Sequence, residues 1–345
     1  MEIVKNLFFQ KKVLDPPSYM NIKQYLQQNN KGALPILSFP AVQKLGITVD
    51  ALVHSAEQQA KVMTYVATQT NTLAAVTPMD LSVEAEAFGA SVRFSRDEVP
   101  AVTGQLVCDA EGADALTVPE LTEGRVGKAL IGILLAREKV GDKPLLGGMI
   151  GPFSLAGRLM DVTEIMYLCY DEPEAVHTVL QKATDFLIAY ARAFATAGAD
   201  GVVMAEPLAG VLSPDLAEEF SAPYVSKIIE AVQTEAFGVI YHNCGDAVPS
   251  MLPLIFSQGA CAYHFGNAVD MKEILEQAPA DTVCMGNIDP VAQFVGGTPE
   301  SMREAVRKLK ETCGAYPNFV LSSGCDIPAH AKWENIDAFF DAAAE

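Results

Sequence analysis

Short apolar runs alternate with helix-forming stretches along most of this chain, and this alternation constrains the fold more than any other feature. The runs fall at 34–39, 73–76, 145–150, 199–205, 238–241, 261–263, 282–285 and 318–321. Such a pattern requires a parallel sheet whose strands are joined by helices packed outside it. In a chain of 345 residues without two-half symmetry, it favours an α/β fold of the (β/α)8 TIM-barrel type over an open doubly wound sheet.

The domain organisation follows from the same pattern. No linker divides the chain, so residues 34–345 are predicted to form a single barrel domain. Residues 1–33 are mixed and polar, with an amphipathic stretch around Ile22–Gln28, and are expected to form a helical N-terminal extension. No G-x-G-x-x-G follows the first apolar run, which removes the usual mark of a dinucleotide-binding fold.

Charge and composition exclude several classes of partner. The formal net charge of -19 argues against nucleic acid or an anionic membrane as the main partner. No apolar run approaches the roughly twenty residues that cross a bilayer, and the N-terminus does not resemble a signal peptide. A cytoplasmic protein is expected, and there the seven cysteines are thiols or metal ligands rather than a disulfide framework.

Polar side chains gather where the predicted strands end. In a barrel, the carboxyl ends of all strands surround one pocket, so residues far apart in sequence become neighbours. The candidates at these positions are Asp80, Glu206, His242, Cys244, His264, Asn287, Asp289 and Cys325.

A metal site is predicted from three of these residues. His242 and Cys244 are separated by one residue at a strand end, so both side chains point to the same side. Cys325 follows the last apolar run and completes a His/Cys/Cys set. Imidazole and thiolates suit Zn²⁺, and three protein ligands with one open position are typical of a catalytic zinc site. The alternative is that a cysteine on a strand is a small apolar filler.

The other cysteines are assigned to that alternative, because none has a histidine two residues away and most lie inside an element. They are Cys108, Cys169, Cys261, Cys284 and Cys313.

The remaining strand-end residues have a functional and a structural interpretation. Glu206 and His264 are candidates for a fourth ligand or a proton-transfer group; alternatively Glu206 caps a helix and His264 bonds to a neighbouring strand. Asp80 is a candidate catalytic residue, or a cap for the helix that begins after Ser82. Asn287 and Asp289 are candidate cofactor-binding residues, or part of an Asx-type turn.

The charge of the predicted ligand set points to a reaction class. A Zn²⁺ ion with two thiolates is electron-rich and is therefore not the best activator of water. It can instead hold a substrate thiol as a thiolate at neutral pH, which is the nucleophile that alkyl transfer needs. The ligand set therefore favours methyl transfer to sulfur.

Several motifs resemble those of the uroporphyrinogen decarboxylase superfamily, and within it the methylcobamide:thiol methyltransferases of the coenzyme M type. The motifs are TPMDLSVEAEAFGA, YHNCGD, MGNIDP followed by GGTPE, and SSGCDIP followed by WENIDAF. The resemblance runs from about Leu34 to the C-terminus and implies zinc held by His242, Cys244 and Cys325. It also implies a methylated corrinoid supplied by a separate partner protein, since no cobalamin-binding module fits within the chain.

The decarboxylase branch is the alternative. Its members resemble one another in an N-terminal arginine-bearing segment that grips the substrate carboxylates, whereas no arginine occurs here before Arg93. They also carry Gly-His-Gly where this chain has Gly324-Cys325-Asp326, although Asp80 matches their catalytic aspartate. Within the methyltransferase branch, Tyr263-His264-Phe265-Gly266-Asn267 departs from the expected Ser-x-Asp-like segment, which leaves either a thiol or a nitrogen such as that of tetrahydrofolate as the methyl acceptor.

Overall fold

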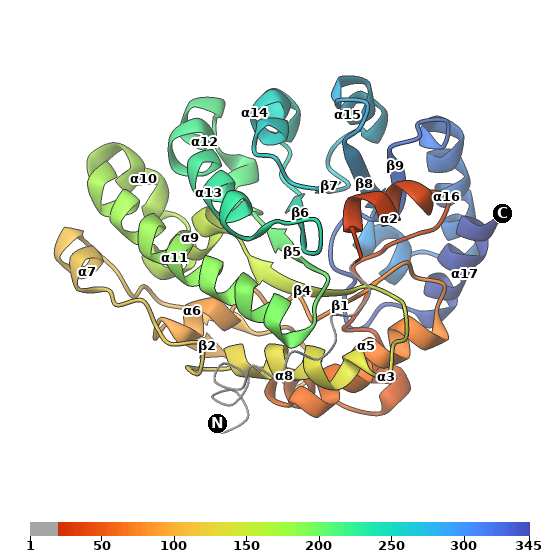
Figure 1. The fold of residues 1–345 in the computed structure, drawn as a ribbon, viewed down its shortest axis with the longest axis horizontal. Helices are drawn as coiled ribbons and strands as arrows, with labels where there is room; N and C mark the ends of the chain where they lie inside the picture. Colours follow the sequence, from red (N-terminus) through yellow and green to blue (C-terminus); the bar gives the residue numbers. More distant parts are fainter. Residues whose placement is uncertain (1–19) are drawn as a thin grey trace.

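A curled parallel sheet forms the centre of the molecule (Figure 1). The structure is a computed structural model that describes residues 20–345. Seven strands pair in the order β1-β4-β5-β6-β7-β8-β9, and every neighbouring pair is parallel. The strands are β1 (Ala75–Val76), β4 (Leu145–Ile150), β5 (Gly201–Ala205), β6 (Gly238–Asn243), β7 (Ala262–Phe265), β8 (Val283–Ile288) and β9 (Phe319–Ser323). This confirms the predicted α/β fold of the TIM-barrel type.

The first predicted strand, at 34–39, is not a regular strand, and this expectation was wrong. Ala33 alone makes parallel bridges, to Thr72 on one side and to Leu321 on the other, so the segment lies between the two edges of the sheet and closes it. Pro35 has no N–H to donate and interrupts the ladder. Serine side chains of β9 replace the missing backbone bonds: Ser323 Oγ accepts from Ile36 N at 3.0 Å, and Ser322 Oγ donates to Leu34 O at 2.6 Å.

Helices surround the sheet. Those before β5 are α2 (Ile22–Gln28), α3 (Ala41–Leu45), α4 (Val49–His54), α5 (Ala56–Gln69), α6 (Val83–Ala87), α7 (Ala110–Ala115), α8 (Val126–Arg137), α9 (Pro152–Met160), α10 (Glu164–Asp171) and α11 (Pro173–Ala197). Those after it are η1 (Leu208–Val211), α12 (Pro214–Phe220), α13 (Ala222–Val232), η2 (Val248–Met251), α14 (Leu252–Ser257), α15 (Met271–Gln277), η3 (Pro290–Val295), α16 (Pro299–Cys313) and α17 (Trp333–Ala344).

The core has two layers, as the period of two along each strand requires. One cluster of buried side chains comes from every strand of the sheet and fills the barrel interior, including Val203, Ile240, Ala262 and Val320. The residues that alternate with these point outward and join a larger cluster beneath the helices. The inward-facing positions of β6, β7 and β9 therefore include His242, His264 and Ser322, at the carboxyl end of the barrel.

Helix α2 closes the opposite end of the barrel. Its buried residues Ile22 and Leu26 belong to the interior cluster, and a Cβ at Gly238, where β6 begins, would lie 3.0 Å from Ile22 Cβ. Lys23 pairs with Asp281 at 2.9 Å, just before β8. The helix predicted around Ile22–Gln28 is thus confirmed and packs into the barrel. Residues 1–19 of the predicted extension 1–33 lie outside the described residues, and Ala33 at its end is bridged to the sheet.

Proline and local hydrogen bonds explain the other element boundaries. The long helix α11 begins at Pro173, and Pro253 lies at the start of α14, where the 3-10 turn η2 changes to an α-helix. The antiparallel pair β2 (Ser91–Arg93) and β3 (Ala101–Thr103) was not predicted, because its short half-exposed strands carry little apolar signal.

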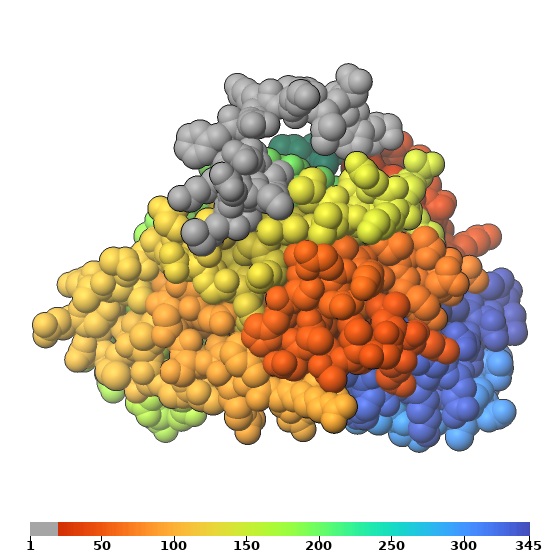
Figure 2. Space-filling view, turned by 90° about the horizontal axis from the view of Figure 1, so that it is seen from below, coloured from red at the N-terminus to blue at the C-terminus, as the bar shows by residue number. Residues whose placement is uncertain are grey.

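The segment that carries α3 to α5 lies beside the C-terminal helices. Figure 2 shows the orange segment that carries α3 to α5 directly beside the blue C-terminal helices, and Trp333 Nε1 donates to Pro40 O at 3.0 Å. Within residues 20–345, none of the helices combines the length and the apolar composition that spanning a bilayer requires.

Candidate metal site

His242, Cys244 and Cys325 converge at the carboxyl end of the barrel. One ligand atom from each lies within 4.8 Å of the others, and Cys325 Sγ is 3.5 Å from His242 Nε2. Tetrahedral zinc with Zn–S of about 2.3 Å and Zn–N of about 2.0 Å places a sulfur and a nitrogen ligand about 3.5 Å apart. The residues present therefore fit a zinc ion in both chemistry and spacing.

Strand register and close backbone packing position the three ligands. His242 lies on β6 opposite His264 of β7, and its side chain points inward like that of Ile240. Cys244 follows one residue after β6 ends and rests directly on Gly266, where an added Cβ would lie 2.5 Å from Cys244 Cα. Gly324 N donates to Ile288 O at 2.6 Å, which turns the chain after β9 and brings Cys325 to the site.

The two neighbouring thiols shift each other's pKa in opposite directions. A hydrogen bond from Cys325 is the main cause that lowers the pKa of Cys244, to about 7. The same contact, together with burial, raises the pKa of Cys325 to about 12. Beside them, burial and the nearby Cys325 raise the pKa of Asp326 well above its usual range, and its Oδ1 has no hydrogen-bond partner. A cation at this point would compensate a buried, electron-rich group of side chains.

A chain of hydrogen bonds continues from His242 into the barrel. His242 Nδ1 lies 2.7 Å from His264 Nδ1, and His264 Nε2 lies 2.7 Å from Ser322 Oγ. His264 therefore contacts the side of the His242 ring that faces away from the cysteines. Our sequence reasoning missed Ser322, although its position two residues after Val320 on β9 places it on the inward face.

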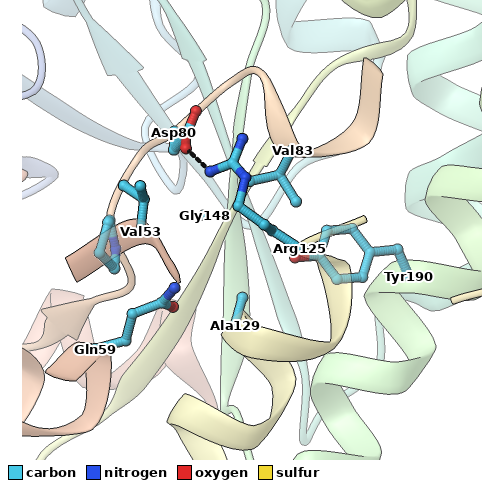
Figure 3. A pocket seen from close by; sticks show the side chains of 9 residues that line it. Val53, Gln59, Asp80, Val83, Arg125, Ala129, Gly148 and Tyr190 are labelled. Carbon is cyan, nitrogen blue, oxygen red and sulfur yellow. Dashed lines mark hydrogen bonds and ion pairs between the residues drawn. The ribbon is translucent and has the colours of Figure 1, made fainter. Parts of the chain in front are cut away.

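Asp80 lies in a buried ion-pair network rather than in an open cavity. Arg125 Nη1 pairs with Asp80 Oδ2 (Figure 3). Arg125 also binds Glu86 at 2.7 Å and Ser82 Oγ at 2.8 Å. The second carboxylate oxygen of Asp80 accepts from Ser82 N and Oγ. The adjoining cavity, of about 10 Å³, has room for about one water molecule. Asp80 therefore pairs with Arg125 and Ser82, and Ser82 rather than Asp80 is the N-cap of α6; the catalytic role of Asp80 stays a prediction.

Glu206 binds the first turn of α9. Its Oε1 accepts from Phe153 N at 2.7 Å, and its Oε2 accepts from Ser154 N at 3.2 Å and Ser154 Oγ at 2.9 Å. Burial nevertheless raises the pKa of Glu206 to about 7. A carboxylate at a helix N-terminus satisfies N–H groups that the helix leaves free. This placement favours the capping alternative, with the side chain directed away from the barrel interior.

Asn287 and Asp289 line a pocket of about 400 Å³ that none of the three candidate metal ligands lines. Asn287 Nδ2 donates to Gly266 O and Val269 O, and so holds the backbone on which Cys244 rests. Asp289 Oδ1 accepts from Val291 N and Ala292 N, which is the Asx-type turn that was the alternative. Their role in cofactor binding stays a prediction.

Four of the five remaining cysteines are covered by the fold. Cys169, Cys284 and Cys313 are buried and Cys261 is half-buried, in agreement with their interpretation as small apolar fillers. Cys108 is exposed, and that interpretation was wrong for it. It precedes Asp109, the N-cap of α7, on a surface loop where no core is available to fill.

Replacing Gly266 with alanine is expected to weaken zinc binding about tenfold or more, because a displaced ligand is comparable to a lost supporting contact. The new Cβ would meet backbone atoms of Cys244, which cannot move without moving the ligand. Gly296→Ala is the matched control, since its added Cβ would find only ordinary contacts at 3.4 Å and beyond. Zinc affinity measured against a competing chelator tests this, and equal affinity in the two variants would contradict it.

Glu84 is expected to make stability fall as the pH rises. Burial raises its pKa from 4.5 to about 7 although Ile150 N donates to its Oε1, and its Oε2 has no partner. Between pH 4.5 and 7 the folded protein then binds more protons than the unfolded chain, so the free energy of unfolding falls with rising pH, by about 3 kcal/mol for this group. Glu84→Gln is neutral at every pH and lacks this contribution.

The test is denaturant unfolding of both proteins from pH 4.5 to 8. The difference between parent and variant should change across this range, while the contribution of Glu206, present in both, cancels. Parallel stability curves would show that Glu84 is already ionised in the folded protein at low pH.

Comparison with known proteins places the chain in a family. The uroporphyrinogen decarboxylase (URO-D) family matches residues 36–345. The methylcobamide:CoM methyltransferase MtbA of Methanosarcina acetivorans is 31% identical over 270 residues, 77% of this chain and 78% of its own. A uroporphyrinogen decarboxylase of Psychromonas ingrahamii is 28% identical over 285 residues, 79% and 78% of the two chains.

A solved methyltransferase from Methanosarcina mazei superposes with a TM-score of 0.83 at 25% identity, covering 94% of this chain and 98% of its own. The resemblance stated from the motifs is therefore confirmed for the family, and methylcobamide:CoM methyltransferases are among the relatives found. The chain belongs to the uroporphyrinogen decarboxylase (URO-D) family of TIM-barrel enzymes.

Proposed function

We propose that this protein is a zinc-dependent methyltransferase that moves a methyl group from a methylated corrinoid protein to a small acceptor. The observation that carries the proposal is the convergence of His242, Cys244 and Cys325 within 4.8 Å at the carboxyl end of the barrel. This is where TIM-barrel enzymes carry out their chemistry. Relatives named as methylcobamide:CoM methyltransferases support the same reaction class.

The chain's own residues would hold the ion and orient the acceptor. His242 Nε2, Cys244 Sγ and Cys325 Sγ would supply three ligands, the number typical of a zinc site that also takes a substrate. Zinc bound there would hold an acceptor thiol as its thiolate at neutral pH. Cys244 and Cys325 are half-buried and His242 is buried, so an acceptor could approach the site from the side of the two thiols.

The methyl donor would arrive on another protein. The relatives' names specify a methylcobamide donor, and we infer that the donor here is a separate corrinoid protein presenting its cofactor to the barrel mouth. A thiol of the coenzyme M kind is the preferred acceptor, because a site with two thiolates suits a sulfur ligand. A nitrogen acceptor such as tetrahydrofolate is the second candidate.

The first test is metal analysis of protein purified without chelator, followed by methyl transfer from methylcobalamin. We expect close to one zinc per chain and loss of the methylcobalamin spectrum when coenzyme M is added. Parallel reactions with tetrahydrofolate distinguish the acceptors. A parent protein that contains no zinc and gains none on incubation with the metal would overturn the proposal.

Uroporphyrinogen decarboxylation is the second candidate function, favoured by decarboxylase relatives at 27–31% identity. Against it, both carboxylate oxygens of Asp80 are engaged by Arg125 and Ser82, and are not free for a substrate. Incubation with uroporphyrinogen separates the two candidates: coproporphyrinogen forms only if the protein is a decarboxylase, and its formation would not depend on zinc.

A further inference from the structure

The geometry points to a positioning role for His264 and Ser322: together they set the ring tautomer of His242 so that its Nε2 lone pair faces Cys325. The inference rests on the zinc site of the proposed function. In this role His264 is neither a metal ligand nor a proton carrier. It holds the His242 ring, by a hydrogen bond, in the orientation and tautomer that a metal ligand needs. The metal-facing contact, from His242 Nε2 to Cys325 Sγ, is 3.5 Å.

The directions of the hydrogen bonds follow from one fixed acceptor. Leu34 O has no proton, so Ser322 Oγ donates to it over 2.6 Å. A serine hydroxyl has a single proton, so the same oxygen accepts from His264 Nε2–H over 2.7 Å. His264 is then protonated on Nε2 and presents a lone pair on Nδ1.

That lone pair decides which ring nitrogen of His242 carries the proton. His264 Nδ1 lies 2.7 Å from His242 Nδ1, and only one of the two nitrogens can carry the shared proton. Because His264 Nδ1 is the acceptor, His242 carries its proton on Nδ1. His242 Nε2 is therefore left with a free lone pair, which is the form that binds a metal.

A second contact gives the same answer independently. His242 Nδ1 also lies 3.3 Å from the backbone oxygen of His264. A carbonyl can only accept, so this contact too requires the proton on His242 Nδ1. The backbone oxygen and the side chain of His264 thus both accept from His242 Nδ1.

Burial prevents water from replacing any partner in this chain of hydrogen bonds. His242, His264 and Ser322 are 2%, 1% and 0% exposed, so water cannot replace any member of the chain. A buried donor or acceptor without a partner costs about 1–3 kcal/mol, and reversing one bond would leave two groups unpaired. Both nitrogens of His264 are occupied, which leaves it none with which to bind zinc as a fourth ligand.

The tautomers of His242 and His264 can be measured in the metal-free protein. Long-range ¹H–¹⁵N NMR distinguishes protonated from unprotonated ring nitrogens, and the chain has only five histidines. We expect His242 as the Nδ1–H tautomer and His264 as the Nε2–H tautomer, assigned by comparison with His264→Asn. The opposite tautomer at either ring would overturn the inference without any reference to zinc.

Zinc affinity, measured with a competing chelator, supplies the second readout. His264→Leu removes the acceptor for His242 and should weaken zinc binding about 10- to 100-fold, the usual effect of losing such a partner. His264→Asn is the matched control, because its Oδ1 can take the place of Nδ1 and should restore affinity to within a fewfold of the parent. Ser322→Ala should also weaken binding, by releasing His264 from its tautomer.

The outcomes separate this inference from the proposed function. If the parent binds zinc and His264→Leu, shown to be folded by its thermal transition, binds it equally well, the positioning role is wrong while the methyltransferase proposal stands. If the parent binds no zinc, the proposed function fails and the NMR tautomers alone decide the inference. If His264→Leu does not fold, the tautomers in the parent and the affinity of Ser322→Ala decide it.

Discussion

Replacing Cys244 or Cys325 with alanine is expected to remove stoichiometric zinc and, with it, methyl transfer from methylcobalamin. Structural zinc sites with four ligands bind with about 10–16 kcal/mol, so one thiolate contributes about 3–4 kcal/mol, which corresponds to a loss of about 100- to 1000-fold in affinity. Metal content after gel filtration, together with chelator competition, measures the loss directly.

The design of this experiment separates metal binding from folding. Cys244 and Cys325 are half-buried residues in loops beyond the strand ends, so their replacement should change the thermal transition little. Cys108→Ala is the matched control, since it removes an exposed cysteine that takes no part in the cluster. Full zinc content in both single variants would contradict the ligand assignment.

Replacing Arg125 with methionine is expected to destabilise the folded protein by about 3–5 kcal/mol. Arg125 is 4% exposed and is the partner of Asp80 and Glu86, whose carboxylates would lose that partner. Methionine fills a similar volume, so the loss reports the unpaired carboxylates rather than a cavity. Denaturant unfolding at pH 7 measures the change.

Two further variants test the cause of that loss. Arg307→Met also removes an arginine with two carboxylate partners, Glu304 and Glu311, but these are exposed on α16 and its replacement should leave stability nearly unchanged. Asp80→Asn added to Arg125→Met removes one uncompensated charge and should recover part of the loss, since the two sites are in contact. Equal effects of Arg125→Met and Arg307→Met would show that burial is not what makes this pair important.

Most of the barrel could be predicted from local patterns because each strand of a parallel barrel is buried on both faces. The runs that form β4, β5 and β6 are apolar along their length, so the ends of each run mark the ends of the strand. The segment at 34–39 is equally apolar, but it lacks the N–H of Pro35 and bonds to serine side chains of β9. No local signal distinguishes it from a strand, because the partner that decides its structure lies almost 290 residues away.

The candidate site divides in the same way. His242 and Cys244 could be paired from a spacing of two on a strand, since that period is a property of the local backbone. Arg125 could not be predicted as the partner of Asp80. It lies where α8 begins, in a region with little periodic signal, and only the fold brings it to Asp80. Glu206 does lie at a strand end, as predicted. Its two carboxylate oxygens, however, accept hydrogen bonds from the first turn of α9, which packs beside it.

The parallel α/β barrel, the family and the pairing of His242 with Cys244 could be predicted from the chain alone, because periodicity and short motifs lie in consecutive residues. The fold was needed to bring Cys325 to 3.5 Å from His242, to pair Asp80 with Arg125, and to turn the nitrogens of His264 toward His242 and Ser322. Hydrogen-bond direction and ion pairing depend on which atoms face one another across strands. That information is absent from any one segment and arises when the barrel closes.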